Sequence, residues 1–272
     1  MKASCYSTFG FSIKKNFQEK VEIWIDKPIE VNNPVDKRIF VCIEPNEISR
    51  INDYLQQNYK DFHYILTYDE SLLNNLPNTV LFEYGTTWIN DDFEFREKEN
   101  NISFVCNNKL YCKGHKMRQK IWHNQNKIEY NKKFFIGTKN VPESLRVITN
   151  SLETYEGNLF LEDCKYPLFN SMFHLCIENI SKKYFFTEKI IDCFLTKTIP
   201  IYWGCTNIHE YFNVNGMILF ENENDFFNKV KNINEDFYNS KKDIIEENYE
   251  KAKMWIDYPC RLENKLKELK IN

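Results

Sequence analysis

Short apolar runs alternate with amphipathic stretches along most of this chain, and this alternation limits its fold more than any other feature. The usual order is a strand-like run, a polar loop, a helix-like stretch and the next strand-like run. Parallel strands need such crossovers, which are usually helices, whereas antiparallel strands can be joined by short turns. The sequence therefore predicts an α/β fold made of parallel βαβ units.

The predicted strands are short and rich in Ile, Val, Phe and Tyr, and they cover residues 39–43, 63–67, 78–84, 102–106, 133–137, 173–177, 199–203 and 217–220. The predicted helices show apolar residues at helical spacing and cover residues 47–59, 115–122, 188–196, 225–233, 241–254 and 261–270. Asp69 and Glu70 are predicted to form an acidic turn.

The densely charged segment 91–101 is the best candidate for a domain boundary. We expect a first domain over residues 1–98 and a second over residues 99–254. The helix within residues 255–272 is expected to pack back on the first domain. With 272 residues, 42% of them hydrophobic, the chain can bury the cores of two such domains.

Charge excludes some classes of partner. The formal net charge is -3, and Lys and Arg are spread along the chain among acids, which argues against nucleic acid or an anionic membrane as the main partner. There is no apolar run of about 18 residues and no signal-peptide core at the start of the sequence. These features predict a cytoplasmic protein, or one that is peripheral to a membrane.

Metal binding is not predicted. The nine cysteines include no C-x-x-C pair and read as free, buried thiols, and the histidines lack metal-ligand spacing. Asp91 and Asp92 are adjacent and lack the Asp-x-Asp spacing that is typical of metal-binding carboxylate pairs. We interpret them as part of a solvated loop.

The segment 173–204 carries the clearest chemistry. A buried strand ends at Glu178 and Asn179, and a loop with Tyr184 and Phe185 follows. These aromatic side chains can form walls for a base or a sugar. The predicted helix after the loop begins at a capping residue, and its first turn carries an acid and a lysine.

Thr187 is a natural N-cap, and Glu188 and Lys189 follow it in the first helical turn. Free N–H groups and a lysine at a helix N-terminus favour phosphate binding, and a carboxylate there can accept hydrogen bonds from ribose hydroxyls. From the residues alone, the alternative is an ordinary crossover whose charged first turn is solvated.

This segment resembles the donor-site motif of the fucosyltransferase family that comprises the α-1,3 and α-1,4 enzymes. In that family a strand ending Phe-Glu-Asn is followed by a short loop, a Thr-Glu-Lys run, a helix and a strand that ends in Gly. The matching residues here are Glu178, Asn179, Thr187, Glu188, Lys189, Ile199, Pro200 and Gly204. The family commonly has Tyr at the position of Phe185, which leaves the identity of the transferred sugar open.

Two more residues match the family less closely. Arg118 follows a strand and a polar loop, as does a family Arg that reaches the donor diphosphate, although the loop here is longer. Glu44 ends a strand and precedes Pro45, as does the general base of the family. The alternatives are an exposed helix residue for Arg118, a surface lysine for Lys189 and a helix-capping carboxylate for Glu44.

The resemblance implies a GT-B-like fold, with two Rossmann-like domains and a cleft between them. It also implies inverting transfer of fucose from GDP-fucose to a glycan hydroxyl, without a metal or other cofactor. Glu44 would be the base, and Arg118 and Lys189 would bind the diphosphate. Two alternatives stay open: another nucleotide-sugar donor with the same chemistry, and a non-catalytic protein that binds sugars or nucleotides.

Overall fold

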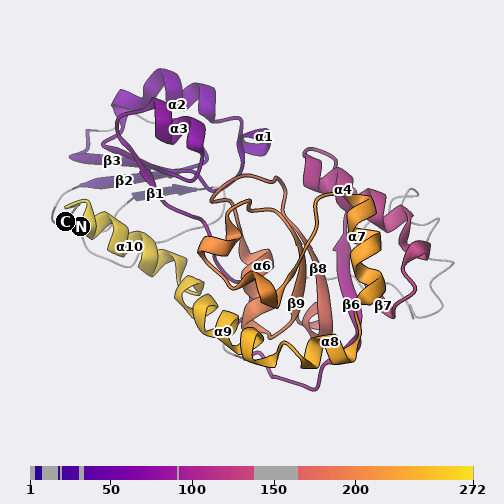
Figure 1. The fold of residues 1–272 in the computed structure, drawn as a ribbon. Helices are drawn as coiled ribbons and strands as arrows, with labels where there is room; N and C mark the ends of the chain where they lie inside the picture. Colours follow the sequence, from indigo (N-terminus) through magenta and orange to yellow (C-terminus); the bar gives the residue numbers. More distant parts are fainter. Residues whose placement is uncertain are drawn as a thin grey trace. The chain divides into compact units, whose positions relative to one another are not determined.

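The structure is a computed structural model that describes residues 4–7, 18, 20–30, 34–90, 92–137 and 165–271. It divides into two compact units, which are drawn in Figure 1. Unit 1 comprises Met1–Thr86, Lys182–Phe185 and Asp257–Asn272, and unit 2 comprises Thr87–Ser181 and Phe186–Ile256. The division after Thr86 lies close to the boundary predicted at residue 98. The acceptor and donor roles of the two parts stay predictions.

Unit 1 contains a parallel sheet whose strands lie in sequence order: β1 (Ser4–Ser7), β2 (Val21–Ile25), β3 (Lys37–Val41), β4 (Tyr64–Thr67) and β5 (Thr79–Leu81). Its helices are α1 (Asn46–Ser49), α2 (Asn52–Asn58), the 3₁₀ turn η1 (Tyr59–Asp61), α3 (Glu70–Asn75) and α10 (Tyr258–Glu268).

Both faces of the unit 1 sheet are covered, because successive side chains of a strand point to opposite faces. Ile23 and Ile39 pack in one cluster with Leu262 of α10. Their neighbours Trp24 and Phe40 pack in another cluster with side chains of α2 and α3. Figure 1 shows α2 and α3 on one side of the sheet and α10 on the other. α10 therefore packs on the sheet of unit 1.

Unit 2 contains a second parallel sheet, formed by β6 (Glu99–Cys106), β7 (Lys132–Ile136), β8 (Ser171–Ile177), β9 (Ile199–Trp203) and β10 (Ile218–Leu219). Its α-helices are α4 (Lys113–His123), α6 (Glu188–Leu195), α7 (Glu223–Lys229), α8 (Glu235–Asn239) and α9 (Lys242–Ala252). Short 3₁₀ turns are η2 (Gln125–Lys127), η4 (Tyr166–Asn170), η5 (Ile208–Glu210), η6 (Val214–Gly216), η7 (Val230–Asn232) and η8 (Lys253–Trp255).

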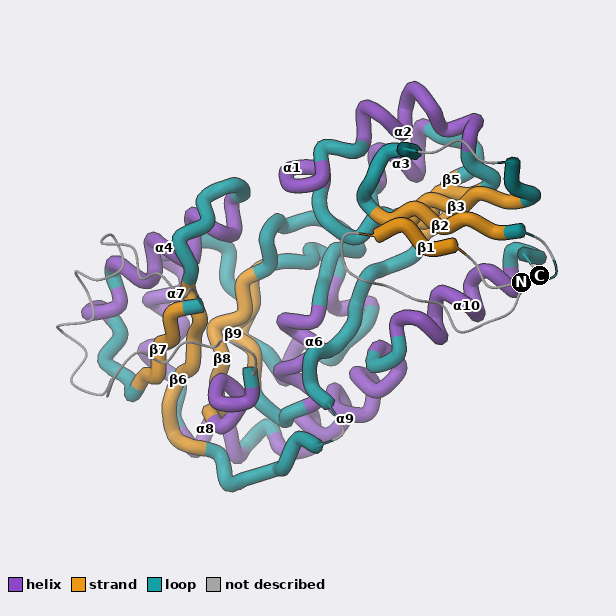
Figure 2. Tube along the Cα trace, turned by 180° about the vertical axis from the view of Figure 1, so that it is seen from behind, coloured by secondary structure: helices purple, strands orange, loops and turns teal. Residues whose placement is uncertain are grey.

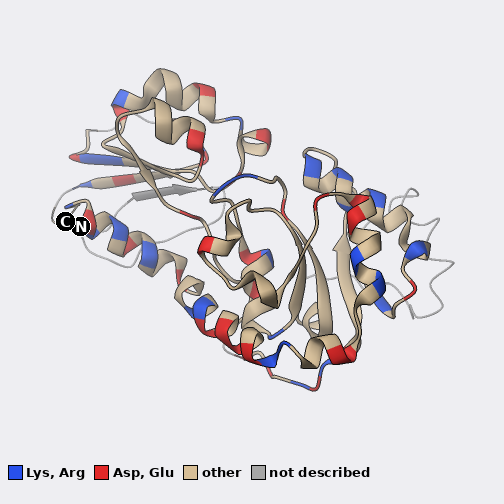
Figure 3. Cartoon of the chain, viewed as in Figure 1, with Lys and Arg blue, Asp and Glu red and all other residues tan. Residues whose placement is uncertain are grey.

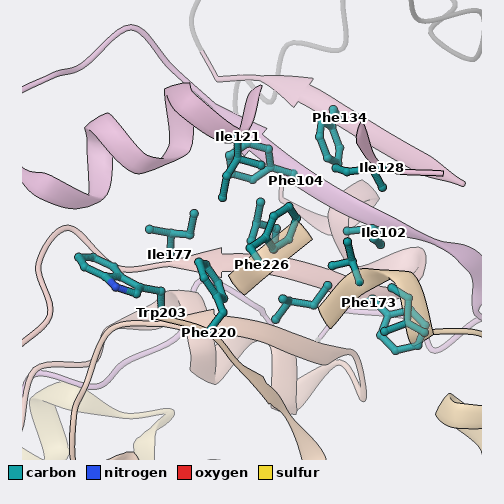
Figure 4. Packing of buried hydrophobic residues seen from close by; sticks show 14 of the residues in the cluster. Ile102, Phe104, Ile121, Ile128, Phe134, Phe173, Ile177, Trp203, Phe220 and Phe226 are labelled. Carbon is teal, nitrogen blue, oxygen red and sulfur yellow. The ribbon is translucent and has the colours of Figure 1, made fainter. Parts of the chain in front are cut away.

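The unit 2 sheet is buried on both faces as well. On one face Phe104, Ile177 and Trp203 pack with Ile121 of α4 and Phe226 of α7 (Figure 4). On the other face, side chains of β8 and β9 pack with α6 and α9. Continuous apolar strands of this kind are typical of parallel sheets that are covered by helices on both sides.

The strand order in unit 2 is β10-β9-β8-β6-β7, and β9, β8, β6 and β7 are labelled in Figure 2. The chain runs from β6 outward to β7 and then returns past β6 to form β8, so the strand order reverses between β6 and β8. This is the flavodoxin-like order of doubly wound folds.

Most predicted elements are confirmed, with ends that differ by a few residues. The single helix predicted over residues 47–59 is wrong, because Arg50 adopts a left-handed conformation with φ of 55° that separates α1 from α2. The acidic turn is also wrong. Asp69 accepts a hydrogen bond from the backbone of Ser71 at 2.9 Å and caps α3. The strands β1 and β2 and the helices α3 and α8 were not predicted from the sequence.

Helices α9 and α10 carry both basic and acidic residues, whereas α4 carries basic residues alone (Figure 3). Within the described part of the chain, no helix is long and apolar enough to span a lipid bilayer.

Candidate functional site

The carboxyl ends of β6 and β8 lie side by side at the reversal of strand order in unit 2. Open parallel sheets bind ligands outside the carboxyl ends of such strands, because the crossover helices diverge there. β6 is followed by α4, and β8 is followed by α6. The residues that connect these strands to these helices are therefore the first candidates for a ligand site.

The first turn of α4 packs directly on the backbone after β8. The amide of Gly114 donates to the carbonyl of Asn179 at 2.9 Å. A Cβ atom at Gly114 would lie 1.8 Å from the carbonyl oxygen of Glu178, so only glycine permits this approach. The N-terminus of α4 is thus fixed against the end of β8.

Arg118 of α4 also reaches the end of β8. Its Nε donates to the carbonyl of Ile177 at 3.1 Å, and its Nη2 bonds to the same oxygen. Nη2 also donates to Oδ1 of Asn179 at 3.1 Å. Arg118 is only 8% exposed, so the alternative of an exposed helix residue is wrong.

The buried guanidinium of Arg118 has no carboxylate within ion-pair distance among the described residues, and no described residue accepts a hydrogen bond from its Nη1. Burial lowers the pKa of Arg118 and Glu178 raises it, but an arginine side chain stays protonated in proteins. A buried charge without a counter-ion is costly. An anion bound beside α4 would offset that cost.

Glu178 holds the start of α6. Its side chain is fully buried, its Oε1 accepts from the backbone N–H of Thr187 at 2.9 Å, and its Oε2 accepts from the Thr187 hydroxyl at 2.9 Å. Gly204 leaves room for this carboxylate, since a Cβ there would lie 2.5 Å from Cγ of Glu178. Burial raises the pKa of Glu178, and Lys189 opposes that rise. The geometry gives Glu178 a positioning role.

Thr187 caps α6, and this confirms the predicted N-cap. Its hydroxyl accepts from the backbone N–H of Lys189 at 3.4 Å. Nζ of Lys189 lies 3.0 Å from the same hydroxyl, 3.3 Å from Oε1 of Glu188 and 3.5 Å from Oε2 of Glu178. Burial alone would lower the pKa of Lys189, but the two carboxylates outweigh burial and raise it. Lys189 is therefore a cation at the N-terminus of α6.

Glu188 lies between two lysines. Its Oε1 is 3.3 Å from Nζ of Lys189 and 3.2 Å from Nζ of Lys165. Burial would raise the pKa of Glu188, but Lys189 and Lys165 hold it below its usual range, so the side chain is a carboxylate. Lys165 also lies 3.9 Å from Oδ2 of Asp192 and 3.6 Å from the ring centroid of Trp88.

Lys165 and Asp192 were not predicted as site residues. Oδ1 of the fully buried Asp192 accepts from the Thr87 hydroxyl at 2.7 Å and from the backbone of Trp88 at 2.9 Å. Burial raises the pKa of Asp192 to about 7, although Lys165 opposes the rise. An acidic residue inside the apolar run 190–195, one turn after Glu188, was the signal that could have identified Asp192.

Two of the predicted donor residues belong to unit 1. The segment Lys182–Phe185 joins β8 to α6 along the chain but is grouped with unit 1. The ring of Phe185 is buried against Tyr68, with ring centroids 4.8 Å apart. Tyr184 has a left-handed backbone with φ of 63°, and Nζ of Lys183 lies 4.6 Å from its ring centroid.

Glu44 follows β3 in unit 1, at the carboxyl end of that sheet, and its side chain is partly buried. Its backbone N–H donates to Oδ2 of Asp26 at 2.8 Å. Asp26, which follows β2 directly, was not predicted as a site residue.

Six of the predicted site residues thus lie close together in unit 2, namely Arg118, Glu178, Asn179, Thr187, Glu188 and Lys189. The other three, Glu44, Tyr184 and Phe185, lie in unit 1.

The described residues contain no cluster of three or more His, Cys, Asp or Glu side chains that could hold a metal ion. Asp92 is exposed and accepts a hydrogen bond from Tyr166, and Asp91 lies outside the described residues. The described free cysteines are buried, apart from Cys260.

Comparison with curated proteins identifies two fucosyltransferase relatives over short segments. The chain is 45% identical over 56 residues to an alpha-(1,3)-fucosyltransferase, FucT, of Helicobacter pylori, which is 21% of this chain and 11% of the relative. It is 39% identical over 64 residues to a putative fucosyltransferase of Acanthamoeba polyphaga mimivirus, which is 22% of this chain and 11% of that relative. No protein-family model matches the chain.

Solved structures match over most of the chain. A crystal structure of an alpha1,3-fucosyltransferase with GDP-fucose has a TM-score of 0.50 at 18% identity, covering 89% of this chain and 71% of the other. A TarM mutant of S. aureus, in complex with Fondaparinux, alpha-GlcNAc-glycerol and UDP, has a TM-score of 0.62 at 15% identity, covering 91% of this chain and 55% of the other. The fold is of the GT-B type. The predicted GT-B-like fold and the resemblance to fucosyltransferases are confirmed.

Proposed function

We propose that this GT-B-type protein is an inverting glycosyltransferase that moves fucose from GDP-fucose to a hydroxyl of a glycan acceptor. The observation that carries the proposal is the buried Arg118 guanidinium, which has no carboxylate partner among the described residues and lies where unit 2 reverses its strand order. A nucleoside diphosphate supplies the anion that this guanidinium lacks. The fucosyltransferase relatives favour GDP-fucose as its source.

In this proposal Arg118 and Lys189 bind the diphosphate and stabilise the charge that develops on it as it leaves. The two cations take the place of a metal ion. Glu188 accepts hydrogen bonds from the ribose hydroxyls, and Asn179 binds within the donor. Glu178 and Thr187 hold the N-terminus of α6 in place.

The reaction is a single displacement. The acceptor oxygen forms a bond to the anomeric carbon of fucose from the face opposite the diphosphate, and the bond from that carbon to the phosphate oxygen breaks. Glu44 takes the proton of the acceptor hydroxyl, and GDP leaves with the bonding electron pair. Attack from the opposite face inverts the anomeric configuration.

One observation favours a second candidate, in which the donor is another nucleotide sugar. Phe185 has no hydroxyl, and its ring is buried against Tyr68. A donor contact that the fucosyltransferase family makes with a tyrosine hydroxyl is therefore missing at this position. Tyr184, the neighbouring residue, is the candidate to replace it. The acceptor-binding role of unit 1 and the donor-binding role of unit 2 are part of the same proposal.

Calorimetric titration with GDP tests the donor site. We expect Arg118→Ala to weaken GDP binding by roughly 10-fold or more, because a charge-assisted contact to phosphate is lost. Lys120→Ala is the matched control, since it removes the same charge from an exposed position on the same helix. Equal GDP affinity in the wild type and Arg118→Ala would refute the donor site.

Release of GDP from GDP-fucose, measured with and without EDTA, tests catalysis. A non-catalytic binding protein would bind GDP without any such release. Turnover that requires Mn²⁺ or Mg²⁺ would contradict the metal-independent mechanism. Faster release from a different nucleotide sugar would favour the second candidate.

A further inference from the structure

Asp26 follows β2 directly, and its backbone is left-handed, with φ of 52°. Residues other than glycine rarely adopt this conformation, and it is concentrated at functional positions. The backbone N–H of Asp26 donates to the carbonyl of Val41, the last residue of β3, at 3.2 Å. Asp26 therefore lies beside the point where β3 ends.

The two carboxylate oxygens of Asp26 each accept one backbone hydrogen bond from the segment after β3. Oδ1 accepts from Ile43 at 3.0 Å, and Oδ2 accepts from Glu44 at 2.8 Å. The hydrogen bonding between β2 and β3 thus extends past the ends of both strands, with the Asp26 carboxylate as the acceptor in place of backbone carbonyls. It fixes the backbone that carries the Glu44 carboxylate.

Among the described residues, the titratable groups that interact directly with Asp26 are acidic or neutral. Burial raises the pKa of Asp26 to about 7, the two backbone hydrogen bonds lower it, and the nearby charge of Glu44 raises it further. The titratable groups that interact with Asp26 come from β3 and its end, from the end of β4 and from α10, and they are Cys42, Glu44, Tyr68 and Tyr258.

Charged groups in the next layer are Asp69, which interacts with Cys42 and Tyr68, and Arg261, which interacts with Tyr258. Asp69 is paired with Lys182 at 3.4 Å. The charge of Glu44 therefore makes proton uptake by Asp26 more favourable.

We propose that Asp26 is a positioning residue that holds Glu44 in place as the catalytic base, through its hydrogen bonds to the backbone of residues 43 and 44. This inference rests on the proposed function, in which Glu44 is that base. Asp26 acts through Glu44, and its loss changes turnover without changing donor affinity.

The test is the release of GDP from GDP-fucose in water, measured against pH, with Asp26→Asn. We expect kcat to fall roughly 10-fold or more, because the amide cannot accept both hydrogen bonds. The inflection that the titration of Asp26 gives the wild-type pH profile near pH 7 should be absent in Asp26→Asn, because the amide does not titrate. The Kd for GDP should not change.

Asp36→Asn is the matched control. Oδ2 of Asp36 accepts a hydrogen bond from the backbone N–H of Lys20 at 2.7 Å. Asp36 therefore joins the segments that precede β2 and β3, whereas Asp26 joins the segments that follow these strands. This control removes the same charge and the same kind of bond. Its kcat and pH profile should equal those of the wild type.

A second variant, Asp26→Gly, keeps the test decisive if Asp26→Asn does not fold. Glycine adopts the left-handed backbone without strain, so the fold is retained while both carboxylate bonds are lost. Wild-type kcat in Asp26→Gly would overturn the proposal. If Glu44→Gln also keeps wild-type turnover, the assignment of the base has failed. If Glu44→Gln is inactive and Asp26→Gly is not, only the role of Asp26 has failed.

Discussion

The backbone N–H of Thr187 donates to Oε1 of Glu178 at 2.9 Å, and this bond ties the start of α6 to the end of β8. The acceptor is a fully buried carboxylate, and the donor belongs to the N-cap residue of the helix. One hydrogen bond therefore connects the two elements on which the proposed donor site depends.

Replacing Glu178 by alanine should destabilise the protein. The N–H and hydroxyl of Thr187 would be left in a buried position without this acceptor, at a cost of roughly 1–3 kcal/mol. Urea unfolding measures the loss. Glu250→Ala removes an exposed carboxylate that pairs with Lys253, and this control should change the free energy of unfolding by less than about 0.5 kcal/mol.

A methyl group at position 114 should weaken both the fold and GDP binding. In Gly114→Ala the new Cβ meets the carbonyl oxygen of Glu178 at 1.8 Å, so α4 has to move and Arg118 moves with it. Overpacking of this kind costs roughly 1–3 kcal/mol. Gly137→Ala is the control, because its Cβ first meets a methyl group of Val105, at 3.0 Å. Equal melting temperatures and GDP affinities for the two variants would contradict this prediction.

Glu44→Gln should lower turnover by roughly 100-fold, the usual scale for the loss of a general base. GDP affinity should stay at the wild-type value, because no donor-binding residue is altered. Glu47→Gln serves as the control, since Glu47 is an exposed carboxylate in the same segment and pairs with Lys182. Turnover of Glu44→Gln near that of this control would show that another group takes the proton.

Stability should depend on the protonation of Asp192. Burial raises the pKa of Asp192 from 3.8 to about 7, so the folded state binds the proton more tightly than the unfolded state does. The stabilisation from this proton is complete below the unfolded pKa and is lost as pH rises through about 7. Relative to Asp192→Asn, the wild type should lose up to about 3 kcal/mol between about pH 5 and pH 8.

The measurement for Asp192 is urea unfolding at a series of pH values. Asp243→Asn, which alters an exposed carboxylate on α9, should keep the pH dependence of the wild type. Parallel curves for Asp192→Asn and the wild type would mean that Asp192 does not change its protonation over this range.

A strand could be predicted from the sequence where its own residues are mostly apolar, because such a run indicates a buried strand. β8 and β9 are buried throughout and mostly apolar, so their runs identify them. β2 was missed because its run contains Glu22. That carboxylate is buried only because Arg38, its partner in the register of β3, lies 3.1 Å away. The sequence of one strand does not show which residue of the neighbouring strand will pair with it.

The donor segment could be predicted because most of its contacts are local. Glu178, Thr187 and Lys189 lie within one stretch of chain, and the capping hydrogen bonds follow from their spacing. Lys165 and Asp26 could not be found in this way. Their partners are brought to them by the packing of elements that are distant in sequence or on separate strands.

The packing of α10 on the unit 1 sheet has a consequence for synthesis on the ribosome. Tyr258 and Leu262 complete the apolar cluster that contains Ile23 and Ile39. Translation reaches α10 only after every strand and helix of unit 2 has been made. One face of the unit 1 sheet therefore stays bare while unit 2 is translated, and the nascent chain is exposed to aggregation until α10 leaves the ribosome.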